Sequence, residues 1–127
     1  MCIRDREHPL SAYYHEIAHG AGLIMLSRAY YTHFVEHCPE LHDRFIDMAK
    51  AMGKTDAKEP MDFVTALVDL QKACGVDELK MSDYGITPEE FPKFVDNARS
   101  TMGILFKLDR LKLTDEDLVK IYTESYR

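Results

Sequence analysis

The chain contains few of the residues that cross-link or interrupt small folds. Its 127 residues include three cysteines, six glycines, five prolines and no tryptophan. The number of cysteines is odd, and none of them form a C-x-x-C pair: they are Cys2, Cys38 and Cys74. Both facts argue against a disulfide framework and against a cysteine zinc site. We expect three free, buried thiols. With 46% hydrophobic residues and little glycine or proline, the composition predicts a folded globular domain.

Long apolar runs are absent as well. The longest, GAGLIML at residues 20–26, is far shorter than the ~20 residues that span a bilayer. A charged leader, an apolar segment and a small-residue cleavage site do not occur in that order. The sequence therefore predicts a soluble, cytoplasmic protein with no membrane partner.

Basic charge is not concentrated anywhere along the chain. The 22 acidic residues exceed the 16 basic ones, and the formal net charge is -6. Nucleic acids and anionic membrane surfaces are bound by basic patches. Neither is expected as a partner of this chain.

Apolar residues recur with the 3.6-residue period of amphipathic helices along most of the chain. No alternating pattern is long enough to indicate a sheet. Helix stop signals at Gly53 and Gly75, and capping pairs at Thr87 with Glu90 and at Thr114, agree with this pattern. We predict an all-α helical bundle of five or six helices. They are expected at a short segment opened by Pro9, and around residues 21–37, 41–52, 63–74, 91–102 and 118–122.

The stretch HEIAHG, which begins at His15, contains the H-E-x-x-H signature of zinc proteases. That chemistry needs His15 and His19 on one continuous helix, together with a third ligand. Met25 stands where the metzincin extension requires a histidine. Gly20 and Gly22 each disfavour an unbroken helix by about 1 kcal/mol relative to Ala. The zinc protease is therefore the least favoured interpretation.

The longer string EHPLSAYYHEIAHGAGLIMLSRAYYTHF resembles the iron-containing alcohol dehydrogenases, in the branch of butanol dehydrogenases and lactaldehyde reductases. The segments MDFVTALVDLQKACGV, SDYGI and LTDEDLVKIYTESYR extend the resemblance over residues 7–127. The resemblance implies the C-terminal, metal-bearing helical domain of the dehydroquinate synthase-like fold, without the N-terminal nucleotide-binding domain. It also implies interconversion of alcohols with aldehydes or ketones by hydride transfer with NAD or NADP.

The resemblance further implies roles for individual residues. In this family one aspartate and three histidines hold a divalent metal, usually Fe2+, and Zn2+ accepts the same ligands. His19 matches the last histidine ligand, and His8 matches a histidine near the nicotinamide and the substrate, in catalysis and cofactor binding. Gly20 and Gly22 would let the backbone approach the ion or the nicotinamide closely. His15 matches no ligand and is expected in an exposed loop.

Three of the four ligands that the resemblance implies have no counterpart here, namely the aspartate and two of the three histidines. Arg4 stands four residues before His8, where another histidine ligand is usual, and a guanidinium has no lone pair to offer a metal. The opening MCIRDR back-translates to the transposon-end adapter used in preparing sequencing libraries, so we expect residues 1–6 to be adapter-derived. The chain as written is expected to be inactive. Its full-length parent, for which a homodimer is one expectation, would act on a small alcohol or aldehyde.

An interpretation from a different class stays open at this point. A stand-alone helical interaction domain would use His8 and His19 only as buried polar residues of its core. The zinc protease, in contrast, predicts zinc binding by the isolated chain and its loss on His15→Ala.

The origin of residues 1–6 has a direct test in the source nucleotides. We expect the adapter sequence at the start of this reading frame. A longer assembly is expected to recover an upstream frame with a Gly-rich phosphate-binding segment and further His and Asp residues. A native start codon behind a ribosome-binding site, with no adapter, would contradict this expectation.

Overall fold

The structure is a computed structural model that describes residues 3–127. Within them lie six α-helices and three short 3-10 helices, and no strand. The all-α prediction is confirmed. The α-helices are α1 (Arg4–Tyr13), α2 (His19–His37), α3 (His42–Ala51), α4 (Met61–Ala73), α5 (Phe91–Phe106) and α6 (Asp115–Ser125), and the 3-10 helices are η1 (Pro39–Leu41), η2 (Ser82–Tyr84) and η3 (Pro88–Glu90).

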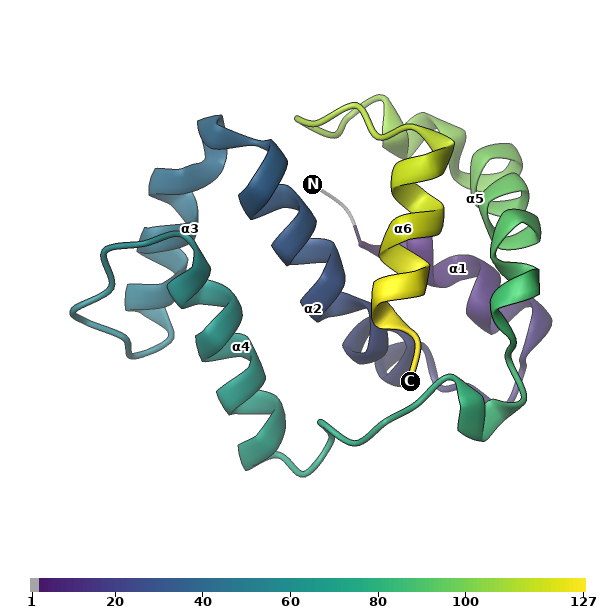
Figure 1. The fold of residues 1–127 in the computed structure, drawn as a ribbon, viewed down its shortest axis with the longest axis horizontal. Coiled ribbons are helices and arrows are strands. Elements are labelled where there is room, and N and C mark those ends of the chain that lie inside the picture. Colours follow the sequence, from purple (N-terminus) through teal and green to yellow (C-terminus); the bar gives the residue numbers. More distant parts are fainter. Residues whose placement is uncertain (1–2) are drawn as a thin grey trace.

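Helix α2 is the central element of the bundle. It packs against α1, α4 and α6, whereas α3 pairs with α4, and α5 pairs with α1 and α6. Figure 1 shows α3 and α4 as one group and α1, α5 and α6 as another, with α2 running between them. This position follows from the composition of α2, because a helix that is apolar on most sides is stable only when buried. Its buried side chains include Met25, Leu26, Tyr30 and Phe34.

Two aromatic clusters fill the core on either side of α2. Ring centroids within each cluster are 5.1–6.4 Å apart, the range in which aromatic pairs attract one another. One cluster joins α2, α3 and α4, and the other joins α5 and α6. The first contains Tyr31, Phe45 and Phe63, and the second contains Phe91, Phe94 and Tyr122.

Local sequence signals set several of the helix ends. Thr114 forms a capping box with Asp117 at the start of α6, and Thr87 forms one with Glu90 ahead of α5. Gly53 follows α3 with a φ of 99°, a backbone conformation that favours glycine because it has no Cβ. The predicted helix ends at these positions are confirmed.

The prediction that Pro9 opens the first helix was wrong. Helix α1 begins at Arg4 and contains Pro9 in its interior. A proline there lacks the N–H that would bond to the carbonyl of Asp5. The side chains of Asp5, Arg6 and Glu7 are all buried, and their contacts hold the first turn in place despite that loss. The residues expected to be adapter-derived thus include the start of α1, and their origin stays a prediction.

The prediction of free, buried thiols is confirmed only in part. Cys38 is buried and free, whereas Cys74 is free but exposed, because it lies at the C-terminal end of α4, outside the core. Cys2 lies outside the described residues.

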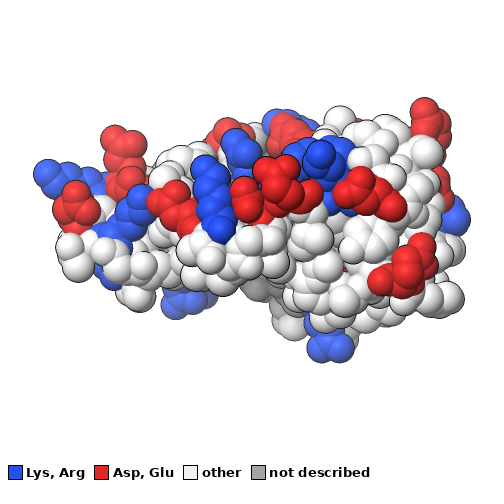
Figure 2. Space-filling model, turned by 90° about the horizontal axis from the view of Figure 1, so that it is seen from below, with Lys and Arg blue, Asp and Glu red and all other residues white. Residues whose placement is uncertain are grey.

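The visible surface mixes charges of both signs. In Figure 2 acidic and basic side chains alternate along one face, without a basic field. None of the helices in residues 3–127 is both long enough and apolar enough to cross a membrane.

A buried cluster of charges fixes α1 to the second half of the chain. The Arg6 side chain is 1% exposed and donates to Oδ1 of Asp5 and Oδ2 of Asp109, each at 2.5 Å. Its guanidinium lies 4.2 Å from the centre of the Phe106 ring, and the Tyr122 hydroxyl donates to the Arg6 carbonyl at 2.5 Å. Burial raises the pKa of the Asp5 carboxyl even though the guanidinium beside it acts to lower that pKa. The negative charges of the Asp5 and Asp109 carboxylates are therefore compensated by the Arg6 guanidinium.

Replacing Arg6 should destabilise the domain strongly. In Arg6→Met the free energy of unfolding is expected to fall by about 3–5 kcal/mol, because two buried carboxyl groups lose their cation. Urea unfolding measures the change. Lys54→Met is the matched control, because Lys54 pairs with Asp69 at 3.0 Å on the surface, and such pairs contribute about 0–1 kcal/mol. Equal losses in the two variants would contradict the role assigned to Arg6.

A buried histidine lies between α2 and α6. His33 is 2% exposed, its Nε2 lies 3.8 Å from Oδ1 of Asp117, and its ring stacks on His37 at 4.3 Å. Burial lowers the pKa of His33 and the neighbouring His37 lowers it further, against the opposing effect of Asp117. Unfolding would restore the ordinary pKa of about 6.5. The unfolded chain therefore binds the proton more readily than the folded one.

Acidification should destabilise the domain through His33. Between about pH 7.5 and pH 5.5 the free energy of unfolding is expected to fall by at most about 1.4 kcal/mol per pH unit, the limit for one proton. Urea unfolding at several pH values should give a shallower slope for His33→Gln. His15→Gln, which changes an exposed histidine, should keep the wild-type slope. The same slope in both variants would refute the assignment.

Candidate functional site

The residues that the family resemblance singles out lie on α1 and at the start of α2, two helices that pack against each other. His8 is in the middle of α1 and partly buried. His19 is the first residue of α2, with its side chain 50% exposed, and Gly20 follows it. His15 and Glu16 lie exposed in the turn between the two helices, so the loop position predicted for His15 is confirmed.

The helix required by a zinc protease is not formed. His15 stands in a turn and His19 begins α2, so their imidazoles are not one helical turn apart on a common face. Among residues 3–127 no group of three or more His, Cys, Asp or Glu side chains is placed to hold a metal ion. The H-E-x-x-H match is therefore a coincidence of spacing.

Glu7, which no sequence pattern singled out, is the partner of His19. Its side chain is fully buried, and its Oε2 lies against Nδ1 of His19. Its Oε1 accepts a hydrogen bond from the Ser11 hydroxyl. The carboxylate thus lies beside the first turn of α2, where unpaired backbone N–H groups and the helix dipole favour negative charge. The His19 ring therefore packs against a buried carboxylate that Ser11 holds through its hydroxyl.

Gly22 provides the space that Glu7 occupies. A Cβ added at Gly22 would lie 2.5 Å from Oε1 of Glu7 and 2.7 Å from its Cγ, closer than real Cβ atoms approach. A Cβ added at Gly20 would meet nothing within 4 Å. Close packing within the chain therefore needs a glycine at 22, and the cofactor contact expected for Gly20 stays a prediction.

The sequence spacing of these residues gave a weak indication of how Glu7, His19 and Gly22 are arranged. Gly22 lies three residues after His19 and Ser11 four residues after Glu7, and both spacings put side chains on one helical face. The crossing of α1 over α2 was needed to bring the two faces together.

Within residues 3–127 the donors are too few to complete a divalent metal site. His19 suits the role of one ligand, because Nδ1 is engaged by Glu7 and Nε2 has no hydrogen-bond partner among the described residues. Arg4, exposed at the start of α1, cannot coordinate a metal. Iron or zinc would therefore require ligands beyond those that residues 3–127 provide.

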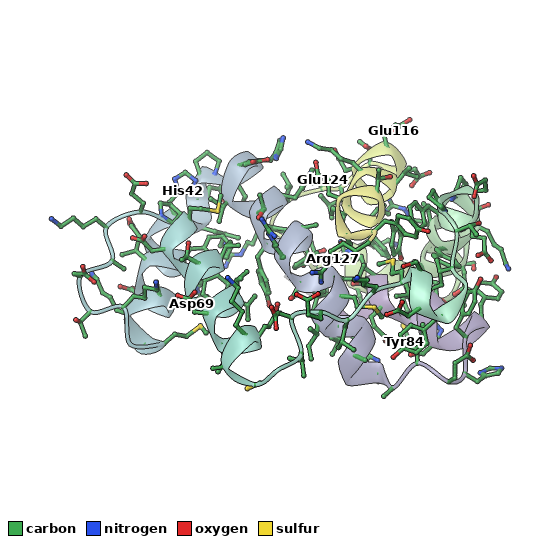
Figure 3. The ribbon with its side chains drawn as sticks, turned by 60° about the horizontal axis from the view of Figure 1, so that its bottom comes forward. His42, Asp69, Tyr84, Glu116, Glu124 and Arg127 are labelled. Carbon is green, nitrogen blue, oxygen red and sulfur yellow. The ribbon has the colours of Figure 1, made fainter. Side chains whose placement is uncertain are left out.

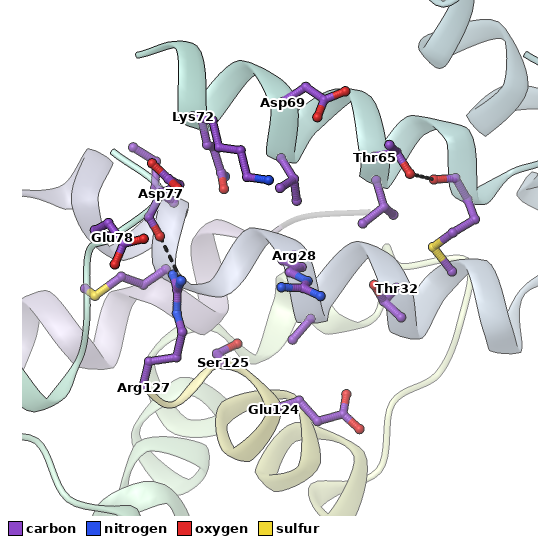
Figure 4. Close-up of a pocket in the computed structure, with 17 residues that line it drawn as sticks. Arg28, Thr32, Thr65, Asp69, Lys72, Asp77, Glu78, Glu124, Ser125 and Arg127 are labelled. Atoms are coloured by element: carbon purple, nitrogen blue, oxygen red, sulfur yellow. Dashed lines mark hydrogen bonds between the residues drawn. The ribbon is translucent and has the colours of Figure 1, made fainter. Parts of the chain in front are cut away.

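A groove of about 850 Å³ lies elsewhere, between α2, α4 and the end of α6 (Figure 4). Arg28, Lys72 and Arg127 line it together with Asp69 and several other acidic side chains, so it favours ligands of neither sign. Its lining includes no histidine and neither of the glycines 20 and 22. The groove is separate from the site around His19.

The end of the chain closes one side of this groove. The Arg127 guanidinium donates to the Asp77 carbonyl at 2.7 Å and to the Leu79 carbonyl at 3.1 Å. In Figure 3 Arg127 and Glu124 lie at the end of α6, and Asp69 lies across from them on α4. These contacts tie the C-terminus to the segment after α4.

Comparison with known sequences places the chain in a family. Residues 4–126 match the family model described as "Fe-containing alcohol dehydrogenase family, C-terminal". The long-chain primary alcohol dehydrogenase AdhA of Thermoanaerobacter ethanolicus is 30% identical to the chain. That alignment covers 94% of the chain and 30% of AdhA.

Two solved structures of an alcohol dehydrogenase contain a region with the same fold as this chain. The archaeal halo-thermophilic Red Sea brine pool alcohol dehydrogenase ADH/D1 bound to NZQ superposes with a TM-score of 0.90 at 23% identity, over 98% of this chain and 32% of that one. A histidine-to-alanine mutant of the same enzyme gives 0.87. The chain spans about a third of the length of the relatives it matches. Because the family model covers nearly its whole length, the chain belongs to the Fe-containing alcohol dehydrogenase family and carries that family's C-terminal region.

Proposed function

We propose that this chain is the metal-bearing, C-terminal part of an NAD(P)-dependent alcohol dehydrogenase. The parent would interconvert an alcohol with an aldehyde or ketone by hydride transfer. The family match over residues 4–126 is the observation that carries this proposal. The name of AdhA suggests a primary alcohol as the substrate. A soluble, cytoplasmic parent that forms a homodimer is part of the same proposal.

Each candidate residue has a place in this proposal. His8, partly buried on α1, would face the nicotinamide and the substrate, where an imidazole can take or give a proton. His19 would contribute one ligand to Fe2+ or Zn2+, and such an ion supplies Lewis acidity toward the substrate oxygen when it is bound. Gly20, where an added Cβ would meet nothing within 4 Å, would leave room for the cofactor.

The isolated chain is proposed to be inactive. Hydride transfer needs a bound nicotinamide, which the family holds mainly with its other domain. The donors within residues 3–127 do not complete a metal site. The chain would then fold around its own core without carrying out the reaction.

The structure offers no support for a stand-alone interaction domain. That alternative requires His8 and His19 to be buried polar residues of the core. Half of the His19 side chain is exposed, and His8 is only partly buried.

The proposal is tested by comparing the chain with its parent. The parent, incubated with Fe2+ or Zn2+, should oxidise primary alcohols with NAD or NADP, measured by nicotinamide absorbance. The 127-residue chain should show no turnover and should retain no stoichiometric metal after desalting. Turnover by the isolated chain, or none by the metal-loaded parent with any alcohol, would overturn the proposal.

A pair of histidine variants in the parent distinguishes the proposed metal ligand, His19, from the loop residue His15. His19→Ala is expected to lower kcat/KM by about 10³-fold or more, because Lewis-acid stabilisation is worth several kcal/mol. It should also lower the metal content. His15→Ala is the matched control four residues earlier, and it should leave activity and metal content unchanged. Equal effects of the two variants would contradict the role of His19.

A further inference from the structure

We propose that Glu7 is a positioning residue that fixes the tautomer and orientation of His19. The Nδ1 atom of His19 would carry the imidazole proton, and Nε2 would offer a lone pair away from the bundle. The contact between the two residues stands on the structure alone. Only the use of the lone pair for a divalent cation rests on the proposed function.

The carboxylate of Glu7 is fully buried. Oε2 of Glu7 accepts no hydrogen bond from the described part of the chain, and the polar atom that lies against it is Nδ1 of His19. An ionised carboxylate can only accept hydrogen bonds. The nitrogen that faces it must therefore carry a hydrogen, and that nitrogen is Nδ1. In a neutral imidazole the other nitrogen, Nε2, then holds the lone pair.

Contacts from both helices keep the Glu7 carboxylate in place. The Ser11 hydroxyl donates to Oε1, so a rotation of the Glu7 side chain would break that bond as well. Gly22 lies so close to Oε1 that any side chain at that position would displace the carboxylate. Glu7 is thus held from α1 by Ser11 and enclosed from α2 by Gly22.

The direction of the His19 ring follows from its contact with Glu7. Nδ1 lies against the buried carboxylate and half of the His19 side chain is accessible, so we expect the accessible half to be the Nε2 side of the ring. A metal-binding histidine usually donates its second ring N–H to a carboxylate or carbonyl, which fixes the tautomer and raises the basicity of the ligating nitrogen. Glu7 provides that arrangement before any cation is present.

The tautomer can be measured on the 127-residue chain with ¹⁵N-labelled histidine, at about pH 8, where imidazoles are neutral. Two histidines serve as internal references. Nδ1 of His37 contacts the His33 carbonyl at 2.9 Å, and Nε2 of His42 contacts the Val35 carbonyl at 2.8 Å. Because carbonyls only accept, His37 must be the Nδ1–H tautomer and His42 the Nε2–H tautomer. We expect the ring ¹⁵N shifts of His19 to match His37. A match to His42 would overturn the proposal, whatever the variants show.

Glu7→Gln should reverse the tautomer. The hydroxyl of Ser11 keeps the glutamine carbonyl on its side, so the NH₂ group faces Nδ1 of His19, which must then accept. The His19 shifts are expected to move to the His42 pattern. Glu16→Gln, an exposed neighbour in the turn, is the matched control and should leave the His19 shifts unchanged. An unchanged His19 pattern in folded Glu7→Gln would refute the role of Glu7.

A pair of glycine variants tests the same contact without changing any charge. Gly22→Ala should displace Glu7 and mix the two tautomers of His19, whereas Gly20→Ala should leave the pattern unchanged. Identical spectra for both alanine variants would contradict the proposal. Its failure is distinct from that of the proposed function, because the tautomer is measured without nicotinamide, metal or turnover. An inactive parent with the expected tautomer would overturn only the dehydrogenase assignment.

Discussion

The buried carboxylate of Glu7, at the crossing of α1 and α2, is the constraint on which the arrangement of the site depends. A buried charge is costly unless hydrogen bonds and nearby positive charge compensate it. Here the compensation comes from both helices, through Ser11 on α1 and through His19 with the first turn of α2. The two helices can approach this closely only because Gly22 has no side chain. A change in their packing would therefore move the His19 imidazole directly.

Helix α1 is held on two sides by adjacent residues. Glu7 reaches α2, whereas Arg6 reaches Asp109 beyond α5 and accepts the Tyr122 hydroxyl of α6 at its carbonyl. Neighbouring residues on a helix point about 100° apart, so these contacts restrain both rotation and tilt of α1. Because α2 also packs against α4 and α6, the site rests on a framework rather than on a loop. Rigid helices position functional groups more accurately than loops do.

Local patterns predicted most of the fold and little of the site geometry. The apolar period located the helices, and the capping pair at Thr114 marked the start of α6, because these signals depend only on near neighbours in the chain. The helix start predicted from Pro9 was wrong, because the place of Pro9 inside α1 depends on buried contacts made by the preceding turn. Glu7 carried only the weak signal of its spacing to Ser11, because its other partners, His19 and Gly22, lie on another helix. The roles given to His8 and His19 came from family resemblance, which spacing alone could not supply.

The exposure of His19 fits the proposal that this domain works with a second one. The domain completes its core from its own helices, with aromatic clusters on both sides of α2. The His19 ring is instead half exposed, although one nitrogen is committed to a buried carboxylate. A stabilising role in the core would not require that exposure. An imidazole oriented from inside and accessible from outside is suited to a ligand that other parts of a longer protein help to bind. The open space beside Gly20 is on the same turn of α2 and fits the same interpretation.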